Sequence, residues 1–218
     1  VQGVLELSGI PIIGCNTMSS AICMDKGTAH RLAKECGVKV PKAYTVSKAE
    51  ANQMQLRIWG RELNYPLFVK PLREGAVRHA FEYDSYVILE ETIPGFEVGC
   101  AVLGTEELLV GEVDEIELSQ GFFDYTEKYT LKTSSIHVPA RISPEKAKEI
   151  KETAKTIYRG LGCSHFARVD MFLTPEGEIY FNEVNTIPGF TAHSRYPNMM
   201  KAAGISFEEL LSRLLACV

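Results

Sequence analysis

No apolar stretch of the sequence reaches the ~18 residues expected of a membrane-spanning helix. Positive charge is not in excess either, because 28 acidic residues outnumber 23 lysines and arginines and leave a formal net charge of -5 at pH 7. Internal repeats and low-complexity tracts are also absent from the sequence. These features argue against a membrane protein and against a chain whose main surface binds nucleic acid.

Cysteine pairs with a recognisable spacing are missing as well. The six cysteines include no CxxC pair and no zinc-type spacing, and the five histidines show no metal-ligand spacing. Scattered thiols of this kind are typical of a reducing compartment, so we expect free cysteines and a cytoplasmic protein. What is present is an ordinary globular composition, with 45% hydrophobic and 23% charged residues, over a length that suits one large domain or two small ones.

The most informative stretch is residues 166–185, FARVDMFLTPEGEIYFNEVN. Aromatic and β-branched residues on both sides of a Thr-Pro-Glu-Gly segment predict two strands joined by a turn. Alternate residues of a strand share a face, so Arg168 and Asp170 point the same way on the first strand. By the same rule Phe181, Glu183 and Asn185 share one face of the second strand.

The register of this hairpin decides which faces coincide. We predict a four-residue loop over residues 174–177, with the flanking residues paired. Asp170 then lies opposite Phe181. Arg168 lies opposite Glu183, and residues directly opposite each other point to the same side of the sheet. A one-residue change of register would separate the polar side chains of the two strands.

The polar surface formed in this way has the chemistry of a magnesium site. Asp170, Glu183 and Asn185 offer two carboxylates and an amide oxygen, and Mg2+ takes oxygen ligands together with substrate phosphates. Arg168 would meet a neighbouring anion. The alternative is a solvated sheet face with an Arg-Glu cross-strand pair, and the residue pattern alone favours neither interpretation.

Two lysines have notable positions. Lys70 follows the apolar run of residues 65–69, which predicts a buried strand, so its charge must find water or an anion. Lys26 lies on a helix predicted over about residues 19–33, where a lysine is usually just solvated. Elsewhere, a Ser-Pro pair at residues 143–144 opens the clearest amphipathic helix, and capping boxes predict helix starts at Ser47 and Ser206.

Two loops carry candidate functional groups. Residues 117–135 show little hydrophobic periodicity and predict a long surface loop, whose Tyr125, Lys128 and Tyr129 can close over a ligand. A mobile polar surface loop that closes over no ligand explains the same composition equally well. The loop over residues 186–190 offers backbone amides that can face an anion.

Six stretches resemble the D-alanine:D-alanine ligase family of ATP-grasp ligases. They are GIPIIGCNTMSSAICMDKGTAHRLAKECGVKVP, PLFVKPLREG, VILEETIPGFEVGCAVLG, FFDYTEKY, FARVDMFL and YFNEVNTIPGFTAHSRYP. They span nearly the entire chain in the family's order and most resemble the vancomycin-resistance D-alanine:D-serine branch. The resemblance implies an α/β (α+β) ATP-grasp fold in which two lobes with mainly antiparallel sheets clasp ATP. It also implies a remnant of an N-terminal domain over residues 1–15, a central lobe over 16–95 and a C-terminal lobe over 96–218.

The resemblance assigns roles to individual residues. The implied ATP contacts are the phosphate-binding Lys26 and Lys70, the adenine-reading Glu90 with the backbone of Glu91 and Ile93, and the ribose-binding Glu97. Asp170, Glu183 and Asn185 match the ligands of two Mg2+ ions, which Mn2+ can replace. Arg168 and the Gly189 amide resemble the pair that stabilises an oxyanion.

The implied reaction has two steps. ATP phosphorylates the carboxylate of D-alanine, and a second substrate attacks the D-alanyl phosphate, which releases phosphate and ADP. Lys128, Tyr129 and Ser194 are further implied catalytic residues, and Tyr129, Ser194 and Arg195 would contact the second substrate. We expect this substrate to be D-serine, because Arg195 can meet a hydroxyl and the Tyr-Lys-Tyr loop favours an amine nucleophile.

Two rival interpretations stay open. One is a housekeeping D-alanine:D-alanine ligase, and the other is a catalytically silent nucleotide-binding module. The resemblance further implies cell-wall precursor synthesis, a homodimer, and no nucleic-acid or membrane partner. The family's glycine- and serine-rich loop is absent after Gly75, and so is its N-terminal domain, so we expect these residues to belong to a longer protein.

Overall fold

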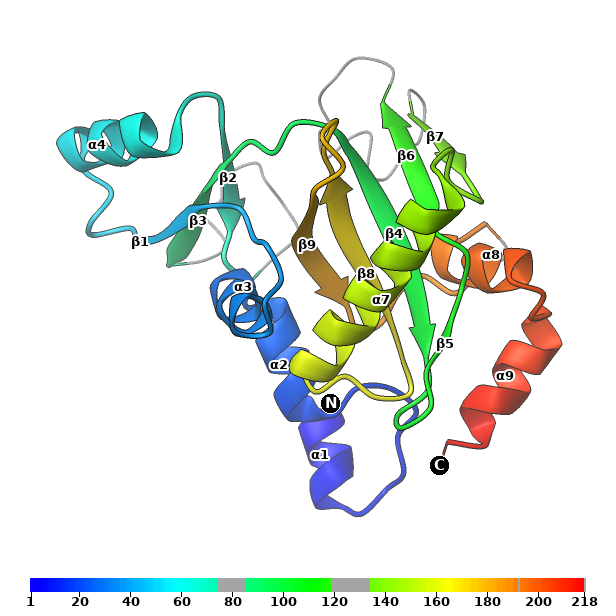
Figure 1. Ribbon diagram of the computed structural model, residues 1–218. Coiled ribbons are helices and arrows are strands. Elements are labelled where there is room, and N and C mark those ends of the chain that lie inside the picture. Colours follow the sequence, from blue (N-terminus) through cyan, green and yellow to red (C-terminus); the bar gives the residue numbers. More distant parts are fainter. Residues whose placement is uncertain (74–84, 119–133, 192, 218) are drawn as a thin grey trace.

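The computed structural model describes residues 1–73, 85–118, 134–191 and 193–217 (Figure 1). Their strands form two antiparallel sheets, one of six strands and one of three. The expected α+β class with mainly antiparallel sheets is therefore confirmed. Within these residues no helix combines the length and the apolar character needed to cross a membrane.

The larger sheet has the strand order β7-β6-β4-β8-β9, with the short β5 paired to β4. Its strands are β4 (Phe96–Leu103), β5 (Leu109–Val110), β6 (Asp114–Leu118), β7 (Ser134–His137), β8 (Phe166–Leu173) and β9 (Ile179–Asn185). All of these pairings are antiparallel. The central strand β4 pairs with β8 over its whole length, and on its other side it pairs with β6 at residues 97–99 and with β5 at residues 102–103.

Helices cover both faces of the larger sheet (Figure 1). The helices of the described residues are α1 (Gln2–Leu7), α2 (Thr17–Met24), α3 (Lys26–Glu35), α4 (Gln53–Leu63), α7 (Pro144–Gly160), α8 (Arg195–Ala202) and α9 (Phe207–Leu215). On one face Val98 and Val102 pack among buried residues of α2, α3 and α7. On the other face Ala101 and Leu103 pack against α8 and α9. Strand alternation sorts these side chains, since successive residues of β4 point to opposite faces.

The smaller sheet has the order β1-β3-β2. Its strands are β1 (Ala43–Ser47), β2 (Leu67–Pro71) and β3 (Tyr86–Glu91). One face carries Val46, Val87 and Leu89, which are buried against Leu63 of α4. The opposite face carries Lys70 and Glu90, because Lys70 pairs with Ile88 in the register and Ile88 lies two residues before Glu90.

Two of the predicted helix starts are confirmed. Ser143 caps α7 by accepting a hydrogen bond from the Lys146 amide at 3.2 Å. Ser206 caps α9 in the same way, with 3.1 Å to the Glu209 amide. These caps satisfy amides that the first turn of a helix leaves without a partner.

The single helix predicted over residues 19–33 is wrong. The chain leaves the helical conformation at Asp25, which has ψ 97°, and forms α2 and α3 on either side. The Asp25 carboxylate then accepts a hydrogen bond from the Thr28 amide at 2.9 Å. Lys26 consequently becomes the first residue of α3, and its amide donates to the Leu72 carbonyl at 3.1 Å.

The predicted helix start at Ser47 is also wrong. Ser47 and Glu50 do form both hydrogen bonds of a capping box, at 3.0 Å and 3.3 Å. The helix nevertheless begins at Gln53, because Asn52 accepts a hydrogen bond from the Gln55 amide at 2.9 Å and caps α4 itself. A capping box is therefore compatible with an isolated turn.

The β8-β9 hairpin keeps the predicted turn but not the predicted register. Leu173 pairs with Ile179, one residue further along than expected, and Met171 pairs with Phe181. The predicted pairing of Asp170 with Phe181 is therefore wrong. Met171 and Phe181 are both 0% exposed and lie in the core with α7, so Phe181 does not share a face with Glu183.

An irregularity between Asp170 and Met171 shifts the register by one more residue. Asp170 consequently pairs with Glu183, and Arg168 pairs with Asn185. Asn182 is the extra residue of β9 at this bulge, and an extra residue reverses the face to which the following side chains point. The polar residues of the two strands thus meet on one face, but through a bulge that the sequence pattern did not reveal.

Candidate functional site

A row of acidic residues crosses one face of the larger sheet. Gly99 of β4 pairs with Asp114 of β6 on one side and with Asp170 of β8 on the other. Asp170 pairs in turn with Glu183 of β9. Glu97 shares the face of Gly99 because it lies two residues earlier on β4. We call Glu97, Asp114, Asp170 and Glu183 the carboxylate row.

Asp170 is 1% exposed and bound on both carboxylate oxygens. Arg168 donates from Nε to Oδ1 at 2.8 Å and from Nη2 to Oδ2 at 2.7 Å. Asn185 donates from Nδ2 to Oδ2 at 2.9 Å. Burial by itself would lower the pKa of Arg168, but the charge of Asp170 outweighs it and the pKa is raised. The charges of this pair therefore stabilise each other inside the protein.

Arg195 lies at the start of α8 and spans three members of the carboxylate row. Its Nε and Nη2 bind the two oxygens of Asp114 at 2.6 Å and 2.8 Å. Its Nη1 binds Glu97 at 3.0 Å, and its Nη2 lies 3.4 Å from Asp170. Burial would lower the pKa of Arg195, but the charges of Asp170 and Asp114 hold it well above its ordinary value. Asp114 was not among the residues singled out from the sequence.

The residues of this face fit a magnesium ion by their chemistry. Asp170, Glu183 and Asn185 present two carboxylates and an amide, and hard cations prefer oxygen ligands of this type. Asp170 and Glu183 are cross-strand partners, and Asn185 bonds directly to Asp170. Among the described residues no three His, Cys, Asp or Glu side chains form a metal cluster by themselves. An amide and substrate phosphates would therefore have to complete the ligand shell.

A second group of buried polar residues connects the two sheets. Lys70 lies 2.6 Å from Glu90 Oε2 and donates to Asn182 Oδ1 at 3.3 Å. Asn182 is the bulge residue of β9, so the lysine of the smaller sheet reaches the strand that carries Glu183. Lys70 and Glu90 thus lie together beside β9.

His30 of α3 belongs to this group, although the sequence analysis assigned it no role. Its Nε2 lies 2.8 Å from the Asn182 carbonyl oxygen, so Nε2 carries the proton and donates. Its Nδ1 faces Glu90 Oε1 at 3.8 Å, and neither of these two buried atoms has a hydrogen-bond partner. The pKa of His30 is lowered, first by burial, with Glu90 acting in the opposite direction. The sequence held one signal for a role of His30: it lies four residues after Lys26, and residues with this spacing share a face of a helix.

Two of the remaining predicted nucleotide contacts, Glu91 and Ile93, lie at the end of β3 and just after it. Glu91 accepts a hydrogen bond from the Lys42 amide at 2.8 Å, and its own amide donates to the Lys42 carbonyl at 3.0 Å. Ile93 follows β3 and is partly buried. Glu97 lies apart from them, in the carboxylate row, where it binds Arg195.

The loop before α8 closes on Ser194. Ser194 Oγ accepts a hydrogen bond from the Thr191 amide at 2.9 Å. A Cβ added at Gly189 would lie 2.9 Å from the same Oγ, so a larger residue would push against Ser194. Ser194 and Gly189 are therefore neighbours. Tyr125, Lys128 and Tyr129 lie outside the described residues.

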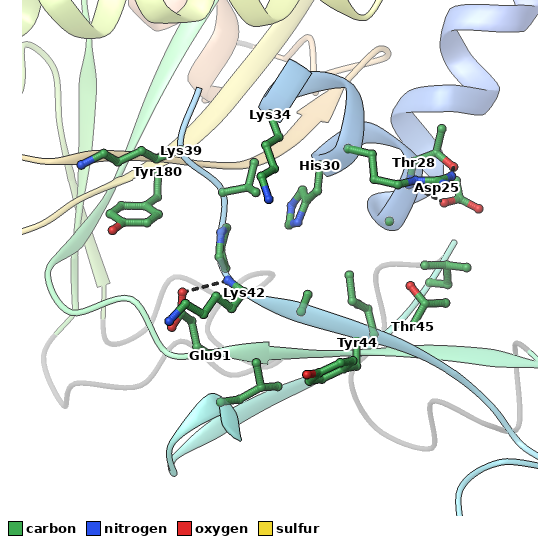
Figure 2. A pocket seen from close by; sticks show the side chains of 18 of the residues that line it. Asp25, Thr28, His30, Lys34, Lys39, Lys42, Tyr44, Thr45, Glu91 and Tyr180 are labelled. Atoms are coloured by element: carbon green, nitrogen blue, oxygen red, sulfur yellow. Dashed lines mark hydrogen bonds between the residues drawn. The ribbon is translucent and has the colours of Figure 1, made fainter. Parts of the chain in front are cut away.

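Two cavities border these groups. A cleft of about 1110 Å³ lies between α3 and β1, and its lining includes His30, Lys34, Tyr44 and Glu91. Figure 2 shows His30 and Lys34 extending from α3 toward the strand that carries Tyr44 and Thr45. Lys70, Glu90 and the carboxylate row do not line this cleft. A smaller cavity of about 520 Å³ lies beside α8 and is lined by His193 and Arg195, among others.

The chain is similar to known proteins over almost its whole length. Residues 32–216 match the family model described as "D-ala D-ala ligase C-terminus". The vancomycin/teicoplanin A-type resistance protein VanA of Enterococcus faecium is 45% identical over 236 residues, which cover 99% of this chain and 67% of that protein.

Two solved structures are similar over almost the whole chain. The VanG D-Ala:D-Ser ligase of Enterococcus faecalis is 56% identical with a TM-score of 0.91, and the match covers 99% of this chain and 67% of that one. The D-alanine--D-alanine ligase of Bacillus anthracis, solved with ATP, is 32% identical with a TM-score of 0.82, over 99% of this chain and 73% of that one. The chain thus spans about two thirds of the length of the curated relatives it matches.

Proposed function

Since this chain belongs to the D-alanine:D-alanine ligase family, we propose that its protein is an ATP-dependent ligase that joins D-alanine to a second D-amino acid. The observation that carries the proposal is the convergence of Asp170, Glu183, Asn185 and Arg168 on one face of the larger sheet. A solvated polar face would not need a 1% exposed carboxylate with arginine on both oxygens. The surface instead suits the transfer of a phosphoryl group.

The nucleotide lies between the two sheets in this proposal. Lys70 and Lys26 neutralise its phosphates, and Glu90 accepts a hydrogen bond from the adenine amino group. The unpartnered Glu90 Oε1 supports this role, because a buried carboxylate oxygen needs a donor and the amino group brings one. A Mg2+ ion, when bound at the carboxylate row, would neutralise phosphate charge and orient the transferred group.

Arg168 and the loop of Gly189 hold the developing negative charge. An ionised carboxylate is a poor electrophile, so the D-alanine carboxylate must become an acyl phosphate before an amine attacks it. The attack creates an oxyanion, which a guanidinium and a backbone amide stabilise. Arg168 is pre-positioned for this task by its two hydrogen bonds to Asp170, which remove the freedom to rotate away.

D-serine is the second substrate in this proposal. The support is the 56% identity to the VanG D-Ala:D-Ser ligase, against 45% identity to VanA. Tyr129, Lys128 and Ser194 complete the environment of the second substrate, with Ser194 fixed by the Thr191 amide. The cavity of about 520 Å³ next to Arg195 gives space beside the start of α8.

The organisation of the whole protein follows from the same family membership. We propose that residues 1–15 belong to an N-terminal substrate domain, that 16–95 and 96–218 form the two lobes around ATP, and that the protein acts as a homodimer in the cytoplasm. Its product would enter cell-wall precursors, and a terminal D-serine would lower their affinity for vancomycin.

The test measures phosphate release by the full-length gene product with ATP and Mg2+. D-alanine alone is compared with D-alanine plus D-serine and with D-alanine plus D-lactate, and the products are identified by mass. We expect D-alanyl-D-serine to dominate. Mostly D-alanyl-D-alanine would identify the housekeeping activity instead. ATP binding without any phosphate release that depends on an amino acid would identify a nucleotide-binding module without catalysis.

A further inference from the structure

We propose that Cys15, Cys23 and Cys163 form a thiol site that a peroxide oxidises, with a Cys23–Cys163 disulfide as the product. The three residues lie far apart in the sequence but belong to one hydrophobic cluster against the larger sheet, where they are 1%, 5% and 7% exposed. All three are free thiols in the structure. The proposed ligase function assigns no role to any of them.

Three separate segments bring the sulfur atoms together. Cys23 lies on the buried side of α2, and its Sγ is 3.7 Å from the Sγ of Cys163, which lies between α7 and β8. Cys15 precedes α2, and its thiol donates to the carbonyl of Ser164, the residue after Cys163, at 3.5 Å. The sulfur atoms of a disulfide are about 2.05 Å apart, so a movement of less than about 2 Å joins Cys23 to Cys163.

Cys15 is the thiol best suited to react first. A hydrogen bond from Cys163 lowers the pKa of Cys15 to about 7, although burial acts in the opposite direction. About half of such a thiol is ionised at pH 7, and the thiolate is the nucleophile. Cys100 of β4 is equally buried, but burial raises its pKa far above the ordinary value. The low pKa of Cys15 therefore comes from its neighbours, chiefly from Cys163.

The oxidation balances with a peroxide as its one co-reactant. The Cys15 thiolate attacks an oxygen of hydrogen peroxide, the O–O bond breaks, and Cys15 becomes a sulfenic acid. The second oxygen leaves as hydroxide and takes up the proton that Cys15 had released, which gives water. The Cys163 thiol then attacks the Cys15 sulfur, and its proton leaves with the sulfenic hydroxyl as a second water. Two thiols and one peroxide thus give one disulfide and two waters.

Cys23 completes the reaction by thiol–disulfide exchange. Its sulfur lies next to that of Cys163, so its thiolate can attack the Cys163 sulfur and displace Cys15. Cys15 is the favoured leaving group because a thiol with a lower pKa leaves faster. The displaced Cys15 thiolate takes up the proton of Cys23, and the Cys23–Cys163 disulfide remains. Disulfides of a reducing compartment are usually transient and redox-sensing, which suits a bond that forms only in the presence of a peroxide.

The product lies next to the proposed nucleotide site in the sequence. Helix α2 ends one residue after Cys23. Asp25 then caps α3, whose first residue is the proposed phosphate-binding Lys26. A shift of Cys23 toward Cys163 would therefore displace the chain just before Lys26, and we expect the oxidised protein to bind Mg·ATP more weakly. This consequence rests on the proposed function, whereas the disulfide itself does not.

The experiment treats the full-length gene product with hydrogen peroxide at pH 7, alkylates the remaining thiols and identifies linked peptides by mass. Cleavage after Met18 separates Cys15 from Cys23, so the two possible partners of Cys163 are distinguished. We expect the Cys23–Cys163 bond in the wild type and its reversal by dithiothreitol. Cys15→Ala should form this bond about 10-fold more slowly, because a thiol of ordinary pKa, about 8.5, is ionised to only a few per cent at pH 7. Cys100→Ala is the matched control and should react at the wild-type rate.

Thermal unfolding checks that each variant is folded, and the serine variant of the same cysteine replaces an alanine variant that is not. A folded wild type that keeps Cys23 and Cys163 reduced, while the exposed Cys36 is oxidised, would overturn the thiol site. An unchanged rate in Cys15→Ala would overturn the order of oxidation. Equal slowing in Cys100→Ala would show a general effect of core substitution and also count against the proposal.

The Kd of a non-hydrolysable ATP analogue with Mg2+, measured before and after oxidation, separates the two proposals. We expect about 10-fold weaker binding after oxidation, the equivalent of one hydrogen bond to a charged group, and no change in oxidised Cys23→Ala. A disulfide with an unchanged Kd would overturn the link to Lys26 and support the thiol site alone. A reduced wild type that binds no nucleotide would overturn the proposed function, while the linked peptides would still support the thiol site.

Discussion

Asp170 in the larger sheet and Glu90 in the smaller sheet are both buried carboxylates, with 1% and 2% exposure, but their surroundings differ. Both oxygens of Asp170 have hydrogen-bond donors, from Arg168 and Asn185. Glu90 has one oxygen near Lys70 and one without a donor. Asp170 is therefore compensated before any ligand arrives, whereas Glu90 retains an acceptor that only a ligand or a proton can satisfy.

The packing around the two carboxylates differs in the same direction. The larger sheet has hydrophobic clusters against both faces, which fix the strands that carry the carboxylate row. The smaller sheet has one cluster with four fully buried members, Val46, Leu63, Val87 and Leu89. Asp170, whose charge is already paired, thus lies on the sheet that is packed on both faces. Glu90, which retains an oxygen without a donor, lies on the sheet with the smaller hydrophobic cluster and the less rigid packing.

We expect the largest effect from substitutions that remove a charge from the carboxylate row. Asp170→Asn or Glu183→Gln should lower kcat by more than the ~10- to 100-fold typical of outer-shell partners, because each removes a proposed metal ligand itself. Phosphate release with D-alanine and D-serine measures this. Glu178→Gln is the control, since Glu178 lies on the same hairpin and pairs with the exposed Lys39. Wild-type turnover in both Asp170→Asn and Glu183→Gln would remove the metal assignment.

The next effect concerns the unsatisfied acceptor of Glu90. Glu90→Gln replaces the carboxylate by an amide that can satisfy His30 Nδ1 but accepts the adenine amino group less well. We expect discrimination between ATP and ITP to fall by about 10- to 100-fold, the equivalent of one buried hydrogen bond. The ratio of kcat/KM for the two nucleotides is the measurement. Glu91→Gln is the neighbouring control, because Glu91 binds the Lys42 amide instead. An unchanged ratio in Glu90→Gln would contradict adenine recognition by Glu90.

A smaller effect tests the space above β4. Gly99→Ala places a methyl group against Arg195 and Asp114, and overpacking of this kind typically lowers the free energy of unfolding by about 1–3 kcal/mol. Chemical denaturation measures it. Gly111→Ala serves as comparison, since its Cβ would meet Met199 at 2.9 Å, away from the charged groups. If only Gly99→Ala also raises the Mg2+ requirement, the charge network rather than the packing is responsible.

The smallest effect is a pH dependence at His30. Its pKa in the folded protein lies below the ordinary 6.5, so the unfolded chain takes up the proton first as the pH falls. Stability should therefore be complete above pH 6.5 and decrease below it, by at most about 1.4 kcal/mol per pH unit. His30→Gln keeps a donor for the Asn182 carbonyl and should flatten this decrease in denaturation curves. The same slope in the variant would exclude His30 as its source.

Much of the local structure could be predicted because its signals are short-range. The Ser143 and Ser206 caps and the turn after Leu173 depend on residues within one or two turns of each other. The hairpin register could not be predicted in the same way, because alternation does not show where a bulge interrupts it. The prediction of a helix start at Ser47 was wrong for a related reason. Its capping box competes with the Asn52 cap, and both satisfy local amides.

The sequence by itself determined the residue types of the candidate site, namely two carboxylates and an amide on β8 and β9, a guanidinium beside them, and two lysines proposed to bind phosphates. Only the tertiary structure decided that they meet, because the bulge at Asn182 turns Glu183 and Asn185 to the face of Asp170. It also decided the partners of Arg195, because Asp114 and Glu97 are 81 and 98 residues away in the sequence. Contacts over such separations depend on how sheets and helices pack, which no local pattern of residues encodes.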